Sequence, residues 1–287
     1  MKTNKDKLIT ISVMGEVAAP TRRINLRVTH EGIPTVFPGT GGITYNVKVG
    51  DLAFGWVGDH IEPGVSVKNK DENENRALQL YTCIGNQAQV FGSSEAKGKK
   101  GIVTGKHGGI EHLLIWFDDD TLEQLAIGDK VQVKARGQGF EIIDLPEVKF
   151  YNIDPDLFLK TGAKVKNGYL EFPVTCIIPP EVMGSGLGSE TSASGDYDIT
   201  TQDPTTIKQL KLDNLRLGDF VFLKDTDNTY GRCMKKGAGS VGIVVHGNCV
   251  LAGHGPGVTT IASSATGKIK PILTKDANIA DYLEINR

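Results

Sequence analysis

The sequence has no apolar run that approaches the roughly 20 residues of a membrane-spanning helix. Its start, MKTNKDKLITISV, is charged and then apolar for too short a stretch to be a signal peptide. Neither sign of charge dominates, because 32 Lys and Arg residues stand against 34 Asp and Glu residues. This balance provides no basic field for a phosphate backbone. We therefore expect neither a membrane nor a nucleic acid among its partners.

Cysteines are few and scattered, and none of the four forms a CxxC pair. A disulfide framework or a structural zinc knuckle needs denser pairing, so we expect reduced, mostly buried thiols and a cytoplasmic protein. The GxSxG, HExxH and GxxxxGK[ST] motifs are also missing. Serine hydrolase, zincin and P-loop interpretations therefore lose their usual support.

Glycine, by contrast, is abundant, with 35 residues in a chain of 287, whereas aromatic residues make up only 7%. Without a collagen period, this much glycine indicates many tight turns between short strands. Gly-Asp pairs at 50–51, 128–129 and 218–219 each lie between two hydrophobic segments, as in turns of small barrels. We predict a mostly β fold with two barrel- or sandwich-like parts and a few short helices.

Periodicity and turn signals place the expected elements. Short helices are predicted at 119–124, 154–161, 203–210 and 277–283, several of them with an Asp cap or an early proline. Strands are predicted at 9–13, 24–29, 78–84, 101–104, 113–117, 130–135, 168–178 and 239–245. Residues 71–75 and 95–100 are expected to be charged loops.

A soft boundary near residues 150–165 separates two predicted domains. The first, 1–155, is an N-terminal β-barrel-like domain, and the second, 156–287, is β-rich. The second domain carries a Gly- and Ser-rich segment, 183–203, with too few apolar residues to pack a core. We expect this segment to be a flexible loop that closes over a substrate.

Two histidines lie in the segment VVHGNCVLAGHGPGVTTI, residues 244–261. Glycines around His254, including Gly255 and Gly257, let backbone N–H groups and the imidazole face one ligand. His246 lies on a strand whose other face is apolar. The alternative is that this segment forms a turn in which the histidines are hydrogen-bonded and purely structural.

Acidic residues supply further candidates. Asp196 and Asp198 fall on one face of an extended segment, which suits a cation or paired acid–base chemistry. Asp227 and Arg232, in the segment DTDNTYGR, are candidates for binding a substrate or anion. The segment resembles a calcium loop only loosely, because its glycine falls at the seventh position and no Glu follows at the twelfth, and solvated turn acids are the alternative.

The first domain contributes two motifs. His60 and Glu62 in GDHIEPG are candidates for proton transfer, with a capped turn as the alternative. His107 and Gly108, in a glycine turn with a basic face, are weakly suited to binding an anion. His112 precedes the apolar run LLIWF and is interpreted as structural.

These motifs together, GDHIEPGVS, KGIVTGKHGG, GDYDITTQD, DTDNTYGR and VVHGNCVLAGHGPGVTT, resemble a family of bacterial and archaeal proteins that is frequent in thermophiles. The family is known only as a domain of unknown function, and the resemblance covers nearly the whole chain. A weaker similarity is to the acetamidase/formamidase family of metal-dependent amidohydrolases. It rests on Gly195-Asp196-Tyr197-Asp198 ahead of a Gly-Asp strand at 217–223. The later Gly-Asp-x-His-Ala element of that family is missing, and the resemblance implies His246 in place of its histidine.

The leading functional hypothesis is a metal-assisted hydrolase, or a related lyase, that acts on a small polar molecule such as an amide. A divalent ion held by some of His246, His254, Asp196 and Asp198 would polarise a carbonyl or activate water. The alternatives are a non-catalytic module that binds a small molecule or anion, and a structural oligomer without a site. Homo-oligomerisation is expected in any case, because long β edges need covering.

Overall fold

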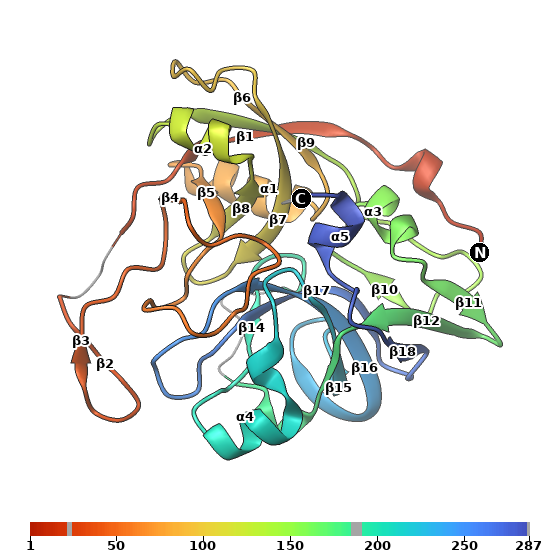
Figure 1. Cartoon of the computed structure of the whole chain (residues 1–287). Coiled ribbons are helices and arrows are strands. Elements are labelled where there is room, and N and C mark those ends of the chain that lie inside the picture. Colours follow the sequence, from red (N-terminus) through yellow and green to blue (C-terminus); the bar gives the residue numbers. More distant parts are fainter. Residues whose placement is uncertain (22–24, 185–190, 286–287) are drawn as a thin grey trace.

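Six strands of the first half of the chain close into a barrel, at the top of Figure 1. The structure, a computed structural model, describes residues 1–21, 25–184 and 191–285. Around the barrel the strands run in the order β1 (Ile11–Val17), β9 (Lys130–Ala135), β6 (Gln87–Val90), β7 (Lys100–His107), β8 (His112–Trp116) and β5 (Gly64–Lys68). Pairing of β5 with β1 closes the ring, and β4 (Ile43–Thr44) extends it beside β5.

Alternation of side chains explains why these segments form the barrel. In β9, Val131, Val133 and Ala135 are buried, whereas Lys130 and Lys134 are exposed. A period of two places every second side chain on the inner face of a strand. The buried faces of the barrel strands form one apolar cluster.

The second half of the chain forms a six-stranded sheet below the barrel (Figure 1). Its main path runs β10 (Lys149–Phe150), β17 (Gly257–Ser264), β16 (Cys233–His246), β15 (Phe220–Asp227) and β13 (Cys176–Ile178), and β14 (Tyr197–Asp198) pairs with β17. Beside it lies a three-stranded sheet of β11 (Lys164–Lys166), β12 (Tyr169–Val174) and β18 (Ile269–Leu273). A two-stranded hairpin, β2 (Arg27–Val28) with β3 (Pro34–Thr35), projects at the lower left of the same view.

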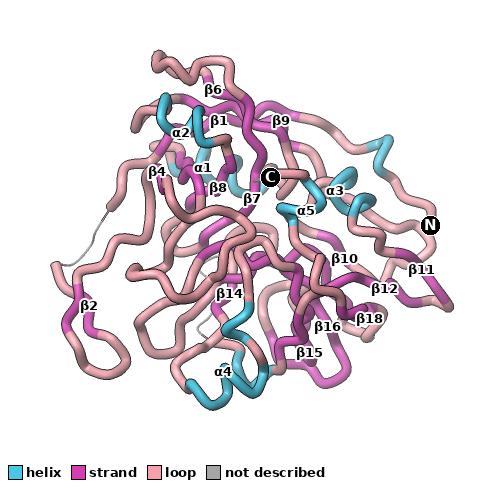
Figure 2. Tube along the Cα trace, in the orientation of Figure 1, coloured by secondary structure: helices cyan, strands magenta, loops and turns pink. Residues whose placement is uncertain are grey.

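The helices are short, as the cyan segments of Figure 2 show. They are α1 (Glu72–Tyr81), α2 (Asp119–Gln124), α3 (Pro155–Lys160), α4 (Pro204–Leu210) and α5 (Ile279–Leu283), with 3-10 turns η1 (Lys5–Lys7), η2 (Pro180–Val182) and η3 (Leu212–Asn214). Asp118, Asp154 and Asp203 cap α2, α3 and α4 by accepting hydrogen bonds from backbone N–H groups. Pro155 and Pro204 occupy early helical positions, where a missing N–H costs nothing.

Three local predictions were wrong. Residues 71–75 and 78–84 were expected to be a charged loop and a strand, but most of this stretch forms α1. Asp71 caps that helix through the N–H groups of Asn73 and Glu74, so the apolar residues that follow continue a helix. The Gly-Asp pair at 50–51 joins no pair of long strands, because only an isolated bridge at Leu52 lies there.

The mostly β fold class is confirmed, with five short α-helices in the described part of the chain. One large apolar cluster joins the two halves, because it contains Ile84 and Phe140 from the first and Phe172, Phe220 and Ile261 from the second. Of the segment predicted to be flexible, residues 185–190 lie outside the described residues, and its C-terminal part pairs with the second sheet through β14. Within the described residues, no helix is long and apolar enough to cross a membrane.

Candidate metal centre

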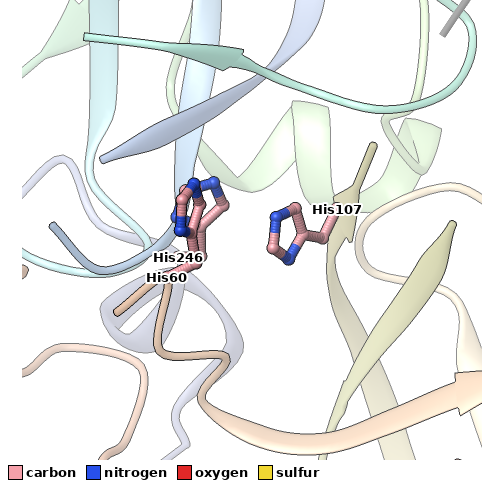
Figure 3. A group of neighbouring side chains, drawn as sticks. All are labelled: His60, His107 and His246. Carbon is pink, nitrogen blue, oxygen red and sulfur yellow. The ribbon is translucent and has the colours of Figure 1, made fainter. Parts of the chain in front are cut away.

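Three buried histidines from three different elements meet where the barrel faces the second sheet. His60 lies in the loop between β4 and β5 with a left-handed φ of 54°, and His107 and His246 are the last residues of β7 and β16. Ring centroids lie 4.2 Å apart for His107 and His246, 5.0 Å for His60 and His246, and 5.6 Å for His60 and His107. Figure 3 shows the His107 ring facing the other two. One ligand atom of each residue lies within 4.8 Å of the other two, which is a spacing that one metal ion can span.

Each of the three rings is held from behind through Nδ1. Nδ1 of His60 donates to Asp59 Oδ1 (3.1 Å), and Nδ1 of His246 donates to the carbonyl oxygen of Gly247 (2.9 Å). Nδ1 of His107 donates to Glu62 Oε1 (2.5 Å). A histidine whose Nδ1–H is engaged in this way presents the lone pair of Nε2, which is the arrangement found behind metal-binding histidines.

Glu62 is a fully buried carboxylate that accepts hydrogen bonds from several donors. Besides His107, Nδ1 of His112 donates to it (2.9 Å), as do Ser66 Oγ (2.5 Å) and the Gly41 N–H (2.6 Å). Burial alone would raise the pKa of Glu62, but the two imidazoles bring it well below its usual range. A carboxylate with this many donors holds the His107 ring in place. The proton-transfer role expected of Glu62 stays a prediction.

The Nε2 atom of His246 lies opposite a carboxylate oxygen, and no hydrogen bond joins the two atoms. It lies 2.8 Å from Asp196 Oδ2 and 3.4 Å from Asp198 Oδ1, and these three residues form a second candidate metal group. Both Nε2 of His246 and Oδ2 of Asp196 are buried and make no hydrogen bond within the described part of the chain. Burial opposes a charge on His246, yet the two aspartates raise its pKa well above the usual value. The two facing atoms therefore require a positive charge between them, either a proton or a metal ion.

Neighbouring groups hold the aspartates in place. Oδ1 of Asp196 accepts from the Gly108 N–H (2.7 Å), and Nδ1 of His254 donates to Asp198 Oδ2 (2.6 Å). This hydrogen bond is the main reason why the pKa of His254 is raised. Only glycine fits at position 257, because a Cβ there would lie 1.9 Å from Asp196 Oδ2 and 2.2 Å from His246 Nε2.

A cavity of about 1240 Å³ opens onto this cluster. His60, His107 and His254 line it, together with residues of the loops between β2 and β5. Burial lowers the pKa of His60, and the neighbouring His246 and His107 rings lower it further, whereas Asp59 raises it. The net lowering favours the neutral form of His60, which is the form that binds metal. A metal ion among the three imidazoles would thus be reached from the cavity.

The structure brings most of the predicted site residues together. His60, His107, His246, His254, Asp196, Asp198, Gly108, Gly255 and Gly257 lie in or directly behind the cluster, and Glu62 lies behind His107. A Cβ at Gly255 would clash with the Ile199 carbonyl oxygen, so glycine is needed there for the close packing of the turn.

Asp227 and Arg232 lie outside the cavity lining. Asp227 accepts from Thr229 at the end of β15. Arg232 stacks over the Tyr197 ring and donates to the Gly184 carbonyl oxygen. Their contacts hold the β15–β16 hairpin and β14 in place.

Sequence reasoning missed the part of His112. The register of the β7–β8 hairpin places His107 opposite His112, so both rings reach the same carboxylate. Two histidines that flank a Gly-Gly turn were the available signal, because a hairpin brings such residues side by side. Asp59, which holds His60, was quoted in its motif but given no role.

Comparison with known proteins assigns the chain to a family. The model described as "Domain of unknown function (DUF4438), N-terminal" matches residues 26–159, and the corresponding C-terminal model matches residues 160–283. The chain belongs to the DUF4438 family. A solved structure, titled "Crystal structure of TM1086", is 51% identical to this chain, the match covers 98% of this chain and 99% of that one, and the TM-score is 0.93.

No curated protein matches the chain. The resemblance to an uncharacterised family is thereby confirmed, whereas none of these matches is to an acetamidase or formamidase. DUF4438 membership fixes the fold and leaves the activity to be argued from the site.

Proposed function

We propose that this protein is a metal-dependent hydrolase in which His60, His107 and His246 bind one divalent first-row ion, with zinc as the first candidate. Imidazole nitrogen is a preferred ligand of zinc and its neighbours. Three protein ligands with the fourth position open to a cavity are the arrangement of catalytic rather than structural zinc sites.

One observation carries the proposal. Nε2 of His246 and Oδ2 of Asp196 face each other at 2.8 Å, both buried and both without a hydrogen bond in the described part of the chain. The Gly247 carbonyl oxygen already engages Nδ1 of His246. This contact is unfavourable unless a proton on Nε2 or a metal ion beside the two atoms compensates it, and for a metal ion the two other imidazoles with anchored Nδ1 atoms supply the remaining ligands.

The chemistry follows from the residues around the ion. A bound divalent ion lowers the pKa of a coordinated water and polarises a carbonyl group. His254 lines the cavity, and its Nδ1 is held by Asp198, so its ring is placed to pass a proton to the leaving group. Asp59 and Glu62 keep His60 and His107 in the tautomer that binds metal. Together these groups suit the hydrolysis of an amide bond.

The test is the metal content of untagged protein that has not met a chelator. We expect close to one equivalent of a divalent metal in the parent protein and a loss of most of it in His107→Ala and in His246→Ala. His30→Ala is the matched control, because His30 lies on the β2–β3 hairpin outside the three-histidine group. Metal-free parent protein that also fails to bind added zinc would refute the proposal and favour a module that only binds a small molecule.

A further inference from the structure

The cavity has more room than a formamide-sized substrate needs. Its volume, about 1240 Å³, exceeds the roughly 300–1,000 Å³ of pockets that bury drug-sized ligands. The histidines line only one part of it. The rest of the space can receive a group that extends well beyond the bond under attack.

The remaining wall is largely apolar. Phe37, Trp56, Val57 and Leu251 line it, and Val28 of the β2–β3 hairpin adds to it. Trp56 is held in place because its Nε1–H donates to the Leu52 carbonyl oxygen (2.8 Å). Val57 is 78% exposed, so its side chain is accessible to a ligand in the cavity. An apolar chain of the ligand would bury these surfaces.

A permanent cation among the described residues stands close to the histidines. Arg27 lines the cavity, and its Nη1 lies 3.1 Å from Asp59 Oδ2. The other oxygen of Asp59 accepts from His60, so a single carboxylate separates the guanidinium from a proposed metal ligand. A guanidinium has five N–H donors and binds carboxylates in bidentate geometry, and the contact with Asp59 engages one of its nitrogens.

We infer that the substrate is an amide with an apolar chain on its carbonyl side and a carboxylate next to its nitrogen, the chemistry of an N-acylated amino acid. The acyl chain lies against Trp56 and Val57, the carboxylate meets Arg27, and the amide carbonyl faces the histidines. Water adds to the carbonyl carbon, the C–N bond breaks and the nitrogen takes a proton. The products are a fatty or arylated carboxylate and a free amino acid. This inference rests on the proposed hydrolysis.

The first measurement is calorimetric binding of three probes to metal-loaded protein: N-octanoylglycine, N-acetylglycine and octanamide. The long conjugate has both the apolar chain and the carboxylate, and each of the others lacks one. We expect N-octanoylglycine to bind at least about tenfold more tightly than either, since several buried methylene groups and one charge-assisted pair each contribute that much. Equal affinity for all three, or no binding, overturns the inference.

Variants assign the two ends of the ligand. Trp56→Ala is expected to weaken N-octanoylglycine about tenfold and to leave N-acetylglycine unchanged. Arg27→Gln is expected to weaken both glycine conjugates about tenfold and to leave octanamide unchanged. Tyr230→Ala is the control, because Tyr230 is 94% exposed and does not line the cavity. Metal content is measured for every variant. If Arg27→Gln contains less metal and binds octanamide as weakly as it binds the glycine conjugates, the assignment of the ligand carboxylate to Arg27 is contradicted.

The two proposals fail in different ways. Metal-loaded protein that binds the three probes alike overturns the substrate class and leaves the metal-dependent hydrolysis standing. Protein that takes up no metal but still prefers N-octanoylglycine overturns the hydrolysis and keeps the ligand class. Release of free glycine from N-octanoylglycine, faster than from N-acetylglycine, supports both.

Discussion

Lys106 shows how single buried residues hold the site together. Its side chain is fully buried, and its Nζ donates to Asn152 Oδ1 (2.6 Å) and to the Ala193 carbonyl oxygen (3.0 Å). Asn152 in turn donates to the carbonyl oxygens of Ser192 and Thr260. Burial lowers the pKa of Lys106 to about 8, because desolvation disfavours the charged form of the ammonium. This small network ties β7 to β17 and to the segment that leads into the two aspartates.

Replacing Asn152 by alanine is therefore expected to be costly. The substitution removes the side-chain acceptor of a buried ammonium and two further hydrogen bonds, so we expect a loss of about 3 kcal/mol in the free energy of unfolding. Chemical denaturation measures it. Asn167→Ala is a matched control, because Asn167 has nearly the same left-handed φ (51° against 50°) but lies exposed in the β11–β12 turn. Equal losses in the two variants would show that the backbone conformation, not the network, sets the cost.

At the scale of elements, an irregularity in β16 sets the orientation of His246, a candidate metal ligand. The pairing of β16 with β17 shifts register between Val244 and His246, and His246 then stands opposite Gly257. A bulge re-aims the side chain that follows it. The glycine opposite leaves room for the His246 ring and the Asp196 carboxylate to approach each other.

Gly257→Ala tests this arrangement. The added Cβ would overlap both Asp196 Oδ2 and His246 Nε2, and Gly257 does not have a left-handed φ, so the backbone itself tolerates alanine. We expect metal affinity to fall at least about tenfold, in line with losses at residues that orient metal ligands, while the far-UV circular dichroism spectrum stays unchanged. Unaltered metal binding would show that the strands shift to accept the methyl group and that the close approach is not required.

A second element-scale prediction concerns the cap of α2. The side chain of Asp118 accepts from the Thr121 N–H (2.8 Å), and hydrogen bonding to Thr121 lowers the pKa of Asp118. We expect Asp118→Ala to cost about 1 kcal/mol at pH 7. A lowered folded pKa stabilises the protein above the unfolded value near 4 and loses this effect as the pH falls through the folded pKa. Unfolding curves of parent and variant should accordingly converge at low pH, and a constant difference would contradict the ionic origin.

The two halves of the molecule are joined by two shared apolar clusters and by the candidate metal site. The apolar cluster between the sheets takes Ile84 and Phe140 from the first half and Phe172, Phe220 and Ile261 from the second. The three-histidine group draws two residues from the barrel side and one from the second sheet. Neither half can bury its share of these clusters, or complete the candidate metal centre, without the other.

Expression of residues 1–155 and 156–287 as separate chains tests this. We expect each chain alone to lack cooperative thermal unfolding, because the exposed faces of the shared core cost more than local strand pairing returns. Circular dichroism melts of each chain, and of the two mixed, measure the outcome. Two independently cooperative halves would show that the shared cluster is an interface between autonomous domains.

The amino-acid sequence by itself determined what depends on neighbours along the chain. Helices at 119–124, 154–161 and 203–210 were predictable because an Asp cap and, in two cases, an early proline act within one turn. The strand at 130–135 was predictable from its alternation. At 78–84 the same kind of reasoning failed, since a short apolar run fits a strand as well as a helix and the distant cap Asp71 decided the matter.

Only the tertiary structure decided how the histidines combine. Local spacing identified His60, His107 and His246 separately and predicted three different roles for them, namely proton transfer, anion binding and metal binding. It also predicted proton transfer by Glu62. Closure of the barrel, the β7–β8 register and the bulge in β16 bring the three rings together and place an acceptor behind each Nδ1. These relations join residues far apart in sequence, so they are set by strand pairing and packing, and no pattern along the chain encodes them.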